Sequence, residues 1–488
     1  MPQPPALQLA DLSDAGRGLT LPVDIVLPGA GSARLVSLLR VLPGQRYVGR
    51  AIWHVGTGEP RVALAKLLVG DKAARHFERE QTGARLLAEQ GMMTPALLAA
   101  NYVNGQGGWL LFEFLEDAES PAGCSEAMVS AIALLHAKGL WQEDLHPDNL
   151  LTQSGRLYFI DGGGVRAENP GEPLSSARAL KNLGMFCAQW PIHADASLAA
   201  VLETYQKANP VSATRWSLSD LHRAVGQQRR LRLADWLKKI ARECSAFCVR
   251  QNDASGLCVV RREEQEALDA LLQNPDAHIA AGHIYKDGGT ATVAKVNIAG
   301  RAVVVKRYNI KNFRHWLTRF WRKSRAWASW REGNRLLALG IATAKPLAIL
   351  ERRRFWLTGT AYLVTEYLEG EDLAARFAGK ADQPELIAPE ELAAIETLFT
   401  DLTRARVSHG DMKGHNLIWV SEDRRQRTED RGQKTEDRGR WALIDLDAMR
   451  AHRFQATFRH AHRRDCERFL RDWRGSGLGK VIAEKVKE

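Results

Sequence analysis

Short apolar runs and longer helical patterns follow one another along the chain, and the same succession occurs in both halves. The runs VALAKLL, around Lys66, and AVVVKRY, around Lys306, are short and partly β-branched, which predicts strands. After each run, apolar residues recur at helical spacing up to Gly91 in the first half and Gly340 in the second. Further strands are predicted at GWLLFEFLED and AYLVTEYLEG. Each half therefore begins with strand, helix and strand.

The later parts of the two halves also match. WQEDLHPDNLL and RLYFIDGGGV in the first half correspond to SHGDMKGHNLIWV and WALIDLDAMR in the second. Five similar segments in the same order indicate a duplication. Each half is strand-rich first and helix-rich later, so we expect an α+β chain with two similar domains. The predicted organisation is an N-terminal extension over 1–34, a first domain over 35–225, a helical connector over 226–283 and a second domain over 284–488.

One segment of the second domain, 421–440, has low complexity. It contains QRTEDRG followed at once by QKTEDRG, with six acids, seven bases and no large apolar residue. Such a composition buries too little apolar surface to order itself, which predicts a disordered insertion. The spacing agrees, because Asp144 and Asp161 are 17 residues apart whereas Asp411 and Asp445 are 34 apart.

The composition is that of a globular protein. Of the 488 residues, 45% are hydrophobic and 26% are charged, which excludes collagen, coiled coil and wholesale disorder. No run approaches the roughly 20 apolar residues of a membrane-spanning helix. The N-terminus lacks the basic start and apolar core of a secretion signal, and six cysteines do not form a disulfide framework. We therefore expect a cytoplasmic chain with reduced thiols.

The net charge of +11 is concentrated in one segment. Between Lys306 and Arg331 there are nine basic residues and no acid, interleaved with Phe and Trp. This pattern favours an anionic membrane surface or an acidic glycolipid as partner. An exposed basic helix that packs its aromatics on its own lobe is an equal alternative. Nucleic acid is a third, for which the sequence has no supporting fold signature.

Candidate chemistry lies in the loop HGDMKGHN and the strand exit after it. Phosphoryl transfer needs a group that orients the attacking hydroxyl, oxygen ligands for magnesium and a cation on the phosphates. Asp411, with Asn416 five residues later, and Asp445 at a strand end supply the first two. Lys306, on an earlier strand, supplies the third. Taken singly, such residues are commonly a turn or a strand edge, but the ordered set occurs twice.

This ordered set resembles the protein-kinase-like fold. HGDMKGHN with IDLD is similar to the lipopolysaccharide core (heptose/Kdo) kinase family, the InaA/WaaP-like group. EDLHPDNLL with FIDGG resembles the same family and the aminoglycoside-phosphotransferase-like kinases. The resemblance spans about 35–225 and 280–488, and it implies two tandem protein-kinase-like bilobal domains, each with a β-rich N-lobe and an α-rich C-lobe.

In the second copy the resemblance implies a role for each matching residue. Asp411 would be the catalytic base, and Lys413 would neutralise the phosphate in transfer. Asn416 and Asp445 would bind Mg²⁺. The implied ATP contacts are Lys306, with Glu332 as its possible ion-pair partner, the hinge residue Glu366, and the turn residues Gly288 and Gly289.

The first copy has the corresponding positions with some departures. The matching residues are Asp144 and His146 as catalytic, Lys66, Glu80 and Glu113 toward ATP, and Asn149 and Asp161 toward the metal. Gln142 stands two residues before Asp144, where the family usually has His. Either Glu78 or Glu80 could pair with Lys66, and neither aligns cleanly with Glu332.

The function expected is that of an ATP- and Mg²⁺-dependent kinase acting on a sugar of the lipopolysaccharide inner core. It would be peripheral at the cytoplasmic face of the inner membrane. The lack of an Ala-Pro-Glu motif argues against protein substrates. Two alternatives stay open, a membrane-associated pseudokinase that serves as a scaffold of the same pathway and a phosphotransferase for a soluble small molecule.

Overall fold

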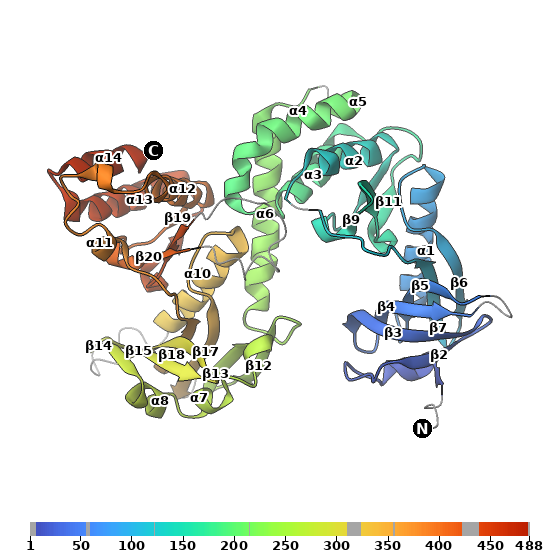
Figure 1. The fold of residues 1–488 in the computed structure, drawn as a ribbon, viewed down its shortest axis with the longest axis horizontal. Coiled ribbons are helices and arrows are strands. Elements are labelled where there is room, and N and C mark those ends of the chain that lie inside the picture. Colours follow the sequence, from blue (N-terminus) through green and yellow to red (C-terminus); the bar gives the residue numbers. More distant parts are fainter. Residues whose placement is uncertain are drawn as a thin grey trace. The chain divides into compact units, whose positions relative to one another are not determined.

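The computed structural model describes residues 6–54, 59–121, 123–213, 215–309, 324–354, 357–421 and 439–486. The chain divides into two compact units: unit 1 comprises 1–189 and 197–228, and unit 2 comprises 190–196, 229–430 and 434–488. Each unit combines a β-sheet with helices (Figure 1), so the fold class is α+β as predicted.

Unit 1 begins with a seven-stranded sheet in the order β1-β2-β3-β4-β5-β7-β6. Its strands are β1 (Leu7–Gln8), β2 (Val23–Leu27), β3 (Gly31–Leu42), β4 (Arg46–Trp53), β5 (Arg61–Leu68), β6 (Leu97–Val103) and β7 (Gly107–Glu113). The segment predicted as an extension, 1–34, is thus not separate, because β1 and β2 add to the sheet beside β3 and bury Val23, Ile25 and Leu27.

The remainder of unit 1 is mostly helical. Its helices are α1 (Ala73–Glu89), α2 (Glu126–Ala137), α3 (Ser176–Cys187), α4 (Leu198–Ala208) and α5 (Pro210–Ala213). Small hairpins are formed by β9 (Leu150–Gln153) with β10 (Arg156–Phe159) and by β8 (Leu140–Gln142) with β11 (Val165–Ala167). Short 3₁₀ turns are η1 (Leu9–Ser13), η2 (Pro147–Asn149) and η3 (Gly162–Gly164). Helix α6 (Leu218–Lys239) contains the boundary between the units.

Unit 2 contains a second seven-stranded sheet, in the order β12-β13-β17-β18-β16-β15-β14. Its strands are β12 (Phe247–Asn252), β13 (Gly256–Arg261), β14 (His283–Gly288), β15 (Ala291–Ile298), β16 (Arg301–Tyr308), β17 (Pro346–Arg354) and β18 (Leu357–Glu366). The order β14-β15-β16-β18-β17 repeats the order β3-β4-β5-β7-β6 of unit 1. Lys66 and Lys306 occupy the equivalent central strands, β5 and β16.

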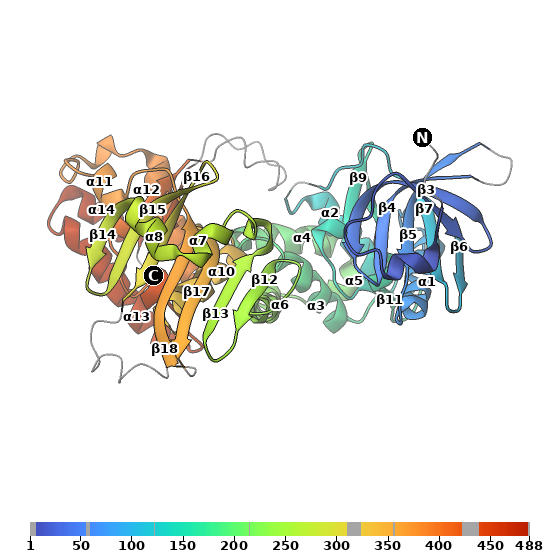
Figure 2. The same cartoon turned by 90° about the horizontal axis from the view of Figure 1, so that it is seen from below.

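The helical connector predicted over 226–283 is wrong in its middle part. Residues 247–261 form the hairpin β12–β13, which lies beside β17 in the second sheet (Figure 2). The run GLCVVR is fully buried in β13, and Asp253 accepts backbone hydrogen bonds from Ser255 and Gly256 in the turn. Apolar, β-branched residues on both sides of a stable turn favour strands, and helical periodicity alone misses them.

The remaining elements of unit 2 are mainly helical. Its helices are α7 (Asp269–Gln273), α8 (Pro275–Ala281), α10 (Arg325–Leu339), α11 (Leu373–Arg376), α12 (Pro389–Ala405), α13 (Gln455–Phe469) and α14 (Gly477–Lys485). The short pairs are β19 (Val407–Ser408) with β22 (Arg450–Ala451) and β20 (Leu417–Val420) with β21 (Arg440–Leu443). The 3₁₀ turns are η4 (Ile192–Ser197), η5 (Arg262–Glu264), η6 (Pro384–Leu386), η7 (Gly414–Asn416), η9 (Leu446–Ala448) and η10 (Leu470–Trp473).

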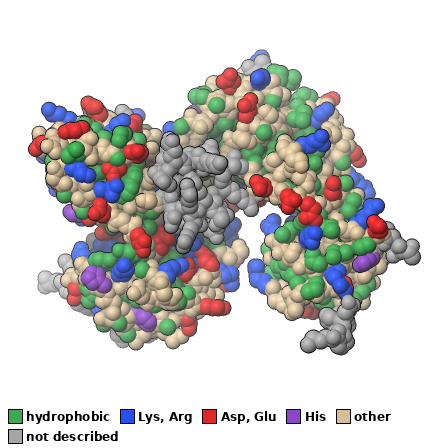
Figure 3. Space-filling view, viewed as in Figure 1, with side chains coloured by type: hydrophobic (Ala, Val, Ile, Leu, Met, Phe, Trp, Pro, Cys, Tyr) green, Lys and Arg blue, Asp and Glu red, His purple; other side chains and the backbone are tan. Residues whose placement is uncertain are grey.

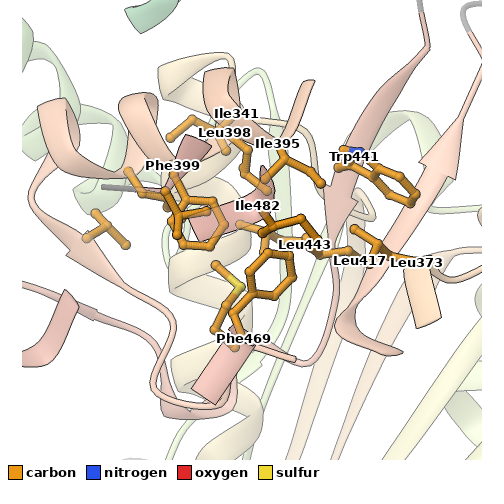
Figure 4. Packing of buried hydrophobic residues seen from close by; sticks show 14 of the residues in the cluster. Ile341, Leu373, Ile395, Leu398, Phe399, Leu417, Trp441, Leu443, Phe469 and Ile482 are labelled. Atoms are coloured by element: carbon orange, nitrogen blue, oxygen red, sulfur yellow. The ribbon is translucent and has the colours of Figure 1, made fainter. Parts of the chain in front are cut away.

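Buried side chains hold the helical part of unit 2 together. Figure 4 shows Leu398, Phe399, Phe469 and Ile482 from three helices packed with Leu443 of β21. Within the described ranges, no helix has both the length and the apolar composition needed to cross a bilayer. The predicted insertion 421–440 lies outside the described residues from 422 to 438, and Val420 pairs with Arg440 beside it.

Candidate active site

A cavity of about 640 Å³ lies in unit 2 between the sheet and the β20–β21 hairpin. Its apolar walls include Val304 and Leu363 of the sheet and Leu443 of the hairpin. The predicted residues Lys306, Glu366, Asn416 and Asp445 all line it. Residues 139 positions apart in the chain are thereby brought into one site.

Lys306 is held by two carboxylates. Its Nζ donates a hydrogen bond to Asp445 Oδ1 at 2.5 Å and lies 3.5 Å from Asp447 Oδ2. Burial disfavours the ammonium, but Tyr308 and the two carboxylates outweigh it, so the pKa of Lys306 is raised. Burial likewise disfavours the Asp445 carboxylate, yet Lys306 lowers the pKa of Asp445 below its ordinary value. Both groups are therefore charged at neutral pH.

The ion pair expected between Lys306 and Glu332 is absent among the described contacts. Glu332 lies on α10, where Arg335 donates to Glu332 Oε2 at 2.5 Å and Arg331 lies 3.5 Å from its Oε1. Arg335 is one helical turn from Glu332, so it reaches the carboxylate without any rearrangement of the helix. Lys306 instead forms ion pairs with Asp445 and Asp447.

The loop that carries Asp411 is fixed from two sides. The backbone N–H groups of His409 and Gly410 donate to the Asp465 carboxylate at 2.6 and 2.9 Å. His409 Nε2 donates to the carbonyl of Ile444 at 3.0 Å, with its ring in the neutral form because burial lowers the pKa of His409. Asp465, on α13, was not predicted from sequence, since no local motif marks it.

The carboxylate of Asp411 contacts two cations. Arg468 Nη1 donates to Asp411 Oδ1 at 2.5 Å, and Lys413 Nζ lies 3.2 Å from Oδ2. Asn416 Nδ2 donates to the Asp411 carbonyl at 2.7 Å, which orients the two predicted residues within one turn. Arg468 was also missed by the sequence analysis.

The comparisons with known proteins concern this half of the chain. Residues 278–478 match the model of the lipopolysaccharide kinase (Kdo/WaaP) family. The match lies wholly within the second half of the chain and covers less than half of its residues, so it is a similarity of that half to the family. Members of this family are lipopolysaccharide kinases, which are phosphotransferases with an alcohol group as acceptor. The resemblance predicted from the motifs is therefore confirmed for the second half.

A solved structure described as WaaP in complex with acyl carrier protein also matches. It is 18% identical, with a TM-score of 0.31, and the match covers 47% of this chain and 88% of that chain. No curated protein sequence matches this chain.

Oxygen atoms of a kind that suits a magnesium ion lie in the cavity of unit 2. In the described parts of the chain, no three His, Cys, Asp or Glu side chains are grouped to hold a metal. The predicted pair is an amide and a carboxylate, Asn416 and Asp445, which line the same cavity. Because the Asn416 nitrogen is engaged by the Asp411 carbonyl, its oxygen points away from that bond. Hard oxygen donors of this kind fit Mg²⁺.

The remaining predicted residues of unit 2 lie at or beside strand ends. Glu366 ends β18, and its Oε1 accepts the Lys345 N–H at 2.7 Å. Gly288 is the last residue of β14 and Gly289 begins the turn to β15, and Asn309 donates to the Gly288 carbonyl at 3.0 Å.

Unit 1 assembles a similar set of residues around Lys66. Lys66 Nζ donates to Glu80 Oε2 at 2.6 Å in a buried pair and lies 3.7 Å from Asp161 Oδ1. Of the two alternatives for this pair, the structure selects Glu80, while Glu78 is exposed. Burial raises the pKa of Asp161, whereas Lys66 and Arg46 lower it. The lowering is the larger effect, so the pKa of Asp161 lies below its ordinary value.

The loop of unit 1 that carries Asp144 has the same internal hydrogen bond as the Asp411 loop of unit 2. Asn149 Nδ2 donates to the Asp144 carbonyl at 2.9 Å, which is the bond that Asn416 makes to Asp411. Gln142, the departure from the family pattern, donates from Nε2 to the Asp161 carbonyl at 2.8 Å. The Gln142 side chain thus connects the loop to the end of the following strand, as the His409 side chain does in unit 2.

Two predicted residues of unit 1 lie at the edges of this set. His146 Nδ1 accepts the Asp148 N–H at 3.2 Å, so the ring caps its own loop. Glu113 ends β7, and its Oε2 accepts the Ala96 N–H at 3.4 Å.

Proposed function

We propose that unit 2 transfers phosphate from ATP, with Mg²⁺, to a sugar hydroxyl of the lipopolysaccharide inner core. The observation that carries this proposal is the convergence of Lys306, Asn416 and Asp445 on one cavity, with Asp411 on the same loop as Asn416. The family match supplies the acceptor class.

The cavity suits a nucleotide in both shape and charge. Val304 and Leu363 on one side and Leu443 on the other offer apolar surfaces to a flat purine. Lys306, one of the cations that line the cavity, would contact the phosphates. Bound Mg²⁺ would neutralise charge on the phosphate oxygens, held by Asn416 and Asp445.

The chemical step follows from the place of Asp411. The acceptor hydroxyl oxygen forms a bond to the γ-phosphorus while the bond from that phosphorus to the bridging oxygen of ADP breaks. The hydroxyl proton passes to the Asp411 carboxylate. Lys413, which lies 3.2 Å from Asp411, would meet the negative charge of the phosphate in transfer.

We further propose that the chain carries two tandem kinase-like domains, one in each compact unit. The common strand order, the equivalent lysines and the shared Asn-to-Asp carbonyl bond support this. In the first domain, Lys66, Glu113, Asn149 and Asp161 would bind nucleotide and metal, with Asp144 as base.

Replacement of the proposed base tests the function directly. Asp411→Asn is expected to lower phosphorylation of core oligosaccharide at least ~100-fold, because proton transfer from the hydroxyl is lost. ATP affinity, measured by calorimetry, should stay within about twofold, because Asp411 does not line the nucleotide cavity. Asp144→Asn measures how much of the kinase activity comes from unit 1. Asp382→Asn, a change at an exposed position, is the control. Unchanged turnover in the Asp411 and Asp144 double variant would refute the mechanism.

A scaffold without turnover is the second candidate, and one observation favours it. In unit 2, Lys306 pairs with Asp445 rather than with Glu332, so the ion pair typical of active kinases is not formed in that unit. Restoration of core phosphate in a deletion strain by the Asp411 and Asp144 double variant would support the scaffold.

A further inference from the structure

A second cavity of about 600 Å³ lies in unit 2 beside the loop of Asp411. Its walls come from the region of α11, from this loop and from the end of α13 with η10. Asp411 and Lys413 line it together with Arg468 and Arg471, whereas they do not line the nucleotide cavity. The cavity therefore reaches the proposed base from the side that the nucleotide does not use.

The charges in this cavity favour an anion. Three cations, Lys413, Arg468 and Arg471, face two carboxylates, Asp411 and Asp472. Lys413 and Arg468 contact Asp411, but Arg471 is exposed, and its side chain makes no hydrogen bond or ion pair within the described ranges. Arg471 is thus a cation ready to bind a ligand in a cavity that ends at the base.

Arg468 connects the cavity to catalysis. Its Nη1 donates to Asp411 Oδ1 at 2.5 Å and to the Gly410 carbonyl at 3.3 Å. Together with Lys413 at Oδ2, it occupies both oxygens that could accept a hydroxyl proton. The Arg468 side chain is 38% exposed, so it can turn toward another anion without unpacking the core.

We propose that this cavity binds an anionic group, a carboxylate or a phosphate, carried by the acceptor sugar chain. Arg471 and Arg468 hold that group, and the contact draws Arg468 from Asp411 Oδ1, which then accepts the hydroxyl proton. The proposal rests on the proposed kinase function and adds the acceptor subsite. A guanidinium binds either anion in two-pronged geometry, so the shared chemistry is the negative oxygen pair.

The test compares acceptors that differ only in charge. The probes are core oligosaccharide as isolated, the same material with its carboxylates converted to amides, and the same material treated with phosphatase. Wild-type KM should rise at least ~10-fold for the form that lacks the recognised anion, which tells carboxylate from phosphate. Arg471→Ala should raise KM for the unmodified acceptor by a similar factor, with kcat and the KM for ATP unchanged.

The variants also separate recognition from structure. Arg471→Ala should change the KM for the neutralised acceptor little, because that acceptor lacks the anionic group that Arg471 would contact. Arg468→Lys should lower kcat as well as raise KM, because it contacts both the anion and the base. Arg474→Ala, an exposed cation three residues from Arg471 that does not line the cavity, is the matched control.

Two results would overturn the subsite. One is a wild-type KM that is the same for all three acceptors; the other is an Arg471→Ala effect of equal size on charged and neutralised forms. Equilibrium binding of the oligosaccharides to Asp411→Asn, followed by calorimetry, tests the subsite without turnover. A failed kinase function and a failed subsite are therefore distinguishable.

Discussion

Asp465 shows at the level of single residues how a distant side chain sets the geometry of the proposed catalytic loop. It lies 56 positions after His409, yet its two oxygens accept the N–H groups of His409 and Gly410. Gly410 has φ +81°, and an added Cβ would lie 2.7 Å from the Ala448 carbonyl oxygen, so the turn needs glycine. The loop conformation thus depends on one buried carboxylate and one glycine.

Loss of the Asp465 charge is therefore expected to loosen the loop. Asp465→Asn should destabilise unit 2 by about 1.5–3 kcal/mol, the usual contribution of hydrogen bonds to a charged group. Turnover should fall together with stability, as measured by urea unfolding and by the kinase assay. Glu467→Gln, an exposed change on the same helix, should alter neither. Full stability of Asp465→Asn would contradict the role assigned to this carboxylate.

Among the elements, helix α12 places a carboxylate in an unfavourable position. Asp401 is 4% exposed, and its Oδ2 lies 3.9 Å from His193 Nδ1 of η4. Burial raises the pKa of Asp401 to about 7; Asp195 adds to the rise, while Arg404 and Arg229 oppose it. The packing of α12 against η4 therefore favours the protonated acid.

The stability of unit 2 should depend on pH through this residue. The folded pKa of Asp401, about 7, lies above the ordinary value of 3.8, so its contribution is fully present below pH 4 and is lost as pH rises to 7. Asp401→Asn removes the charge and should be more stable than the wild type at pH 8, by up to a few kcal/mol. At pH 4 the two should melt alike.

Thermal unfolding of both proteins between pH 4 and pH 8 measures this difference. Glu396→Gln, at an exposed position of α12, is the control. A difference between wild type and Asp401→Asn that does not grow with pH would contradict the predicted titration.

For the whole molecule, the distribution of charge decides which surfaces it can meet. On the face drawn in Figure 3, Lys and Arg side chains lie among Asp and Glu side chains on both units. The net charge of +11 nevertheless resides largely in 306–331, and the part of that segment from 310 to 323 lies outside the described residues. We propose that this segment holds the protein at an anionic membrane surface, where the acceptor is a lipid-linked sugar.

Vesicle binding tests this proposal. Replacing Lys311, Arg314, Arg319 and Arg322 by Gln should weaken binding to vesicles with anionic lipid, by roughly 1 kcal/mol for each charge that meets the surface. Binding of the wild type should also weaken as salt is added, because the attraction is screened.

A variant of equal net charge provides the control. This control replaces four other arginines by Gln, namely Arg424, Arg425, Arg427 and Arg431. The total charge changes by the same amount, but the segment 306–331 is unchanged. Sedimentation with vesicles should therefore separate the two variants. An equal loss of binding in both would show that total charge, and not this segment, determines the attraction.

The sequence by itself indicated the elements that the two halves share, the class of enzyme and the family that the second half resembles. Strands, helices and the loop from Asp411 to Asn416 depend on local periodicity and short spacing, which are written in the chain. Only the tertiary structure decided that Lys306 pairs with Asp445, that Asp465 and Arg468 hold the loop, and that β12–β13 completes the sheet. Ion-pair partners and sheet neighbours are chosen by competition among groups that folding brings together from remote parts of the chain, and no local pattern records that competition.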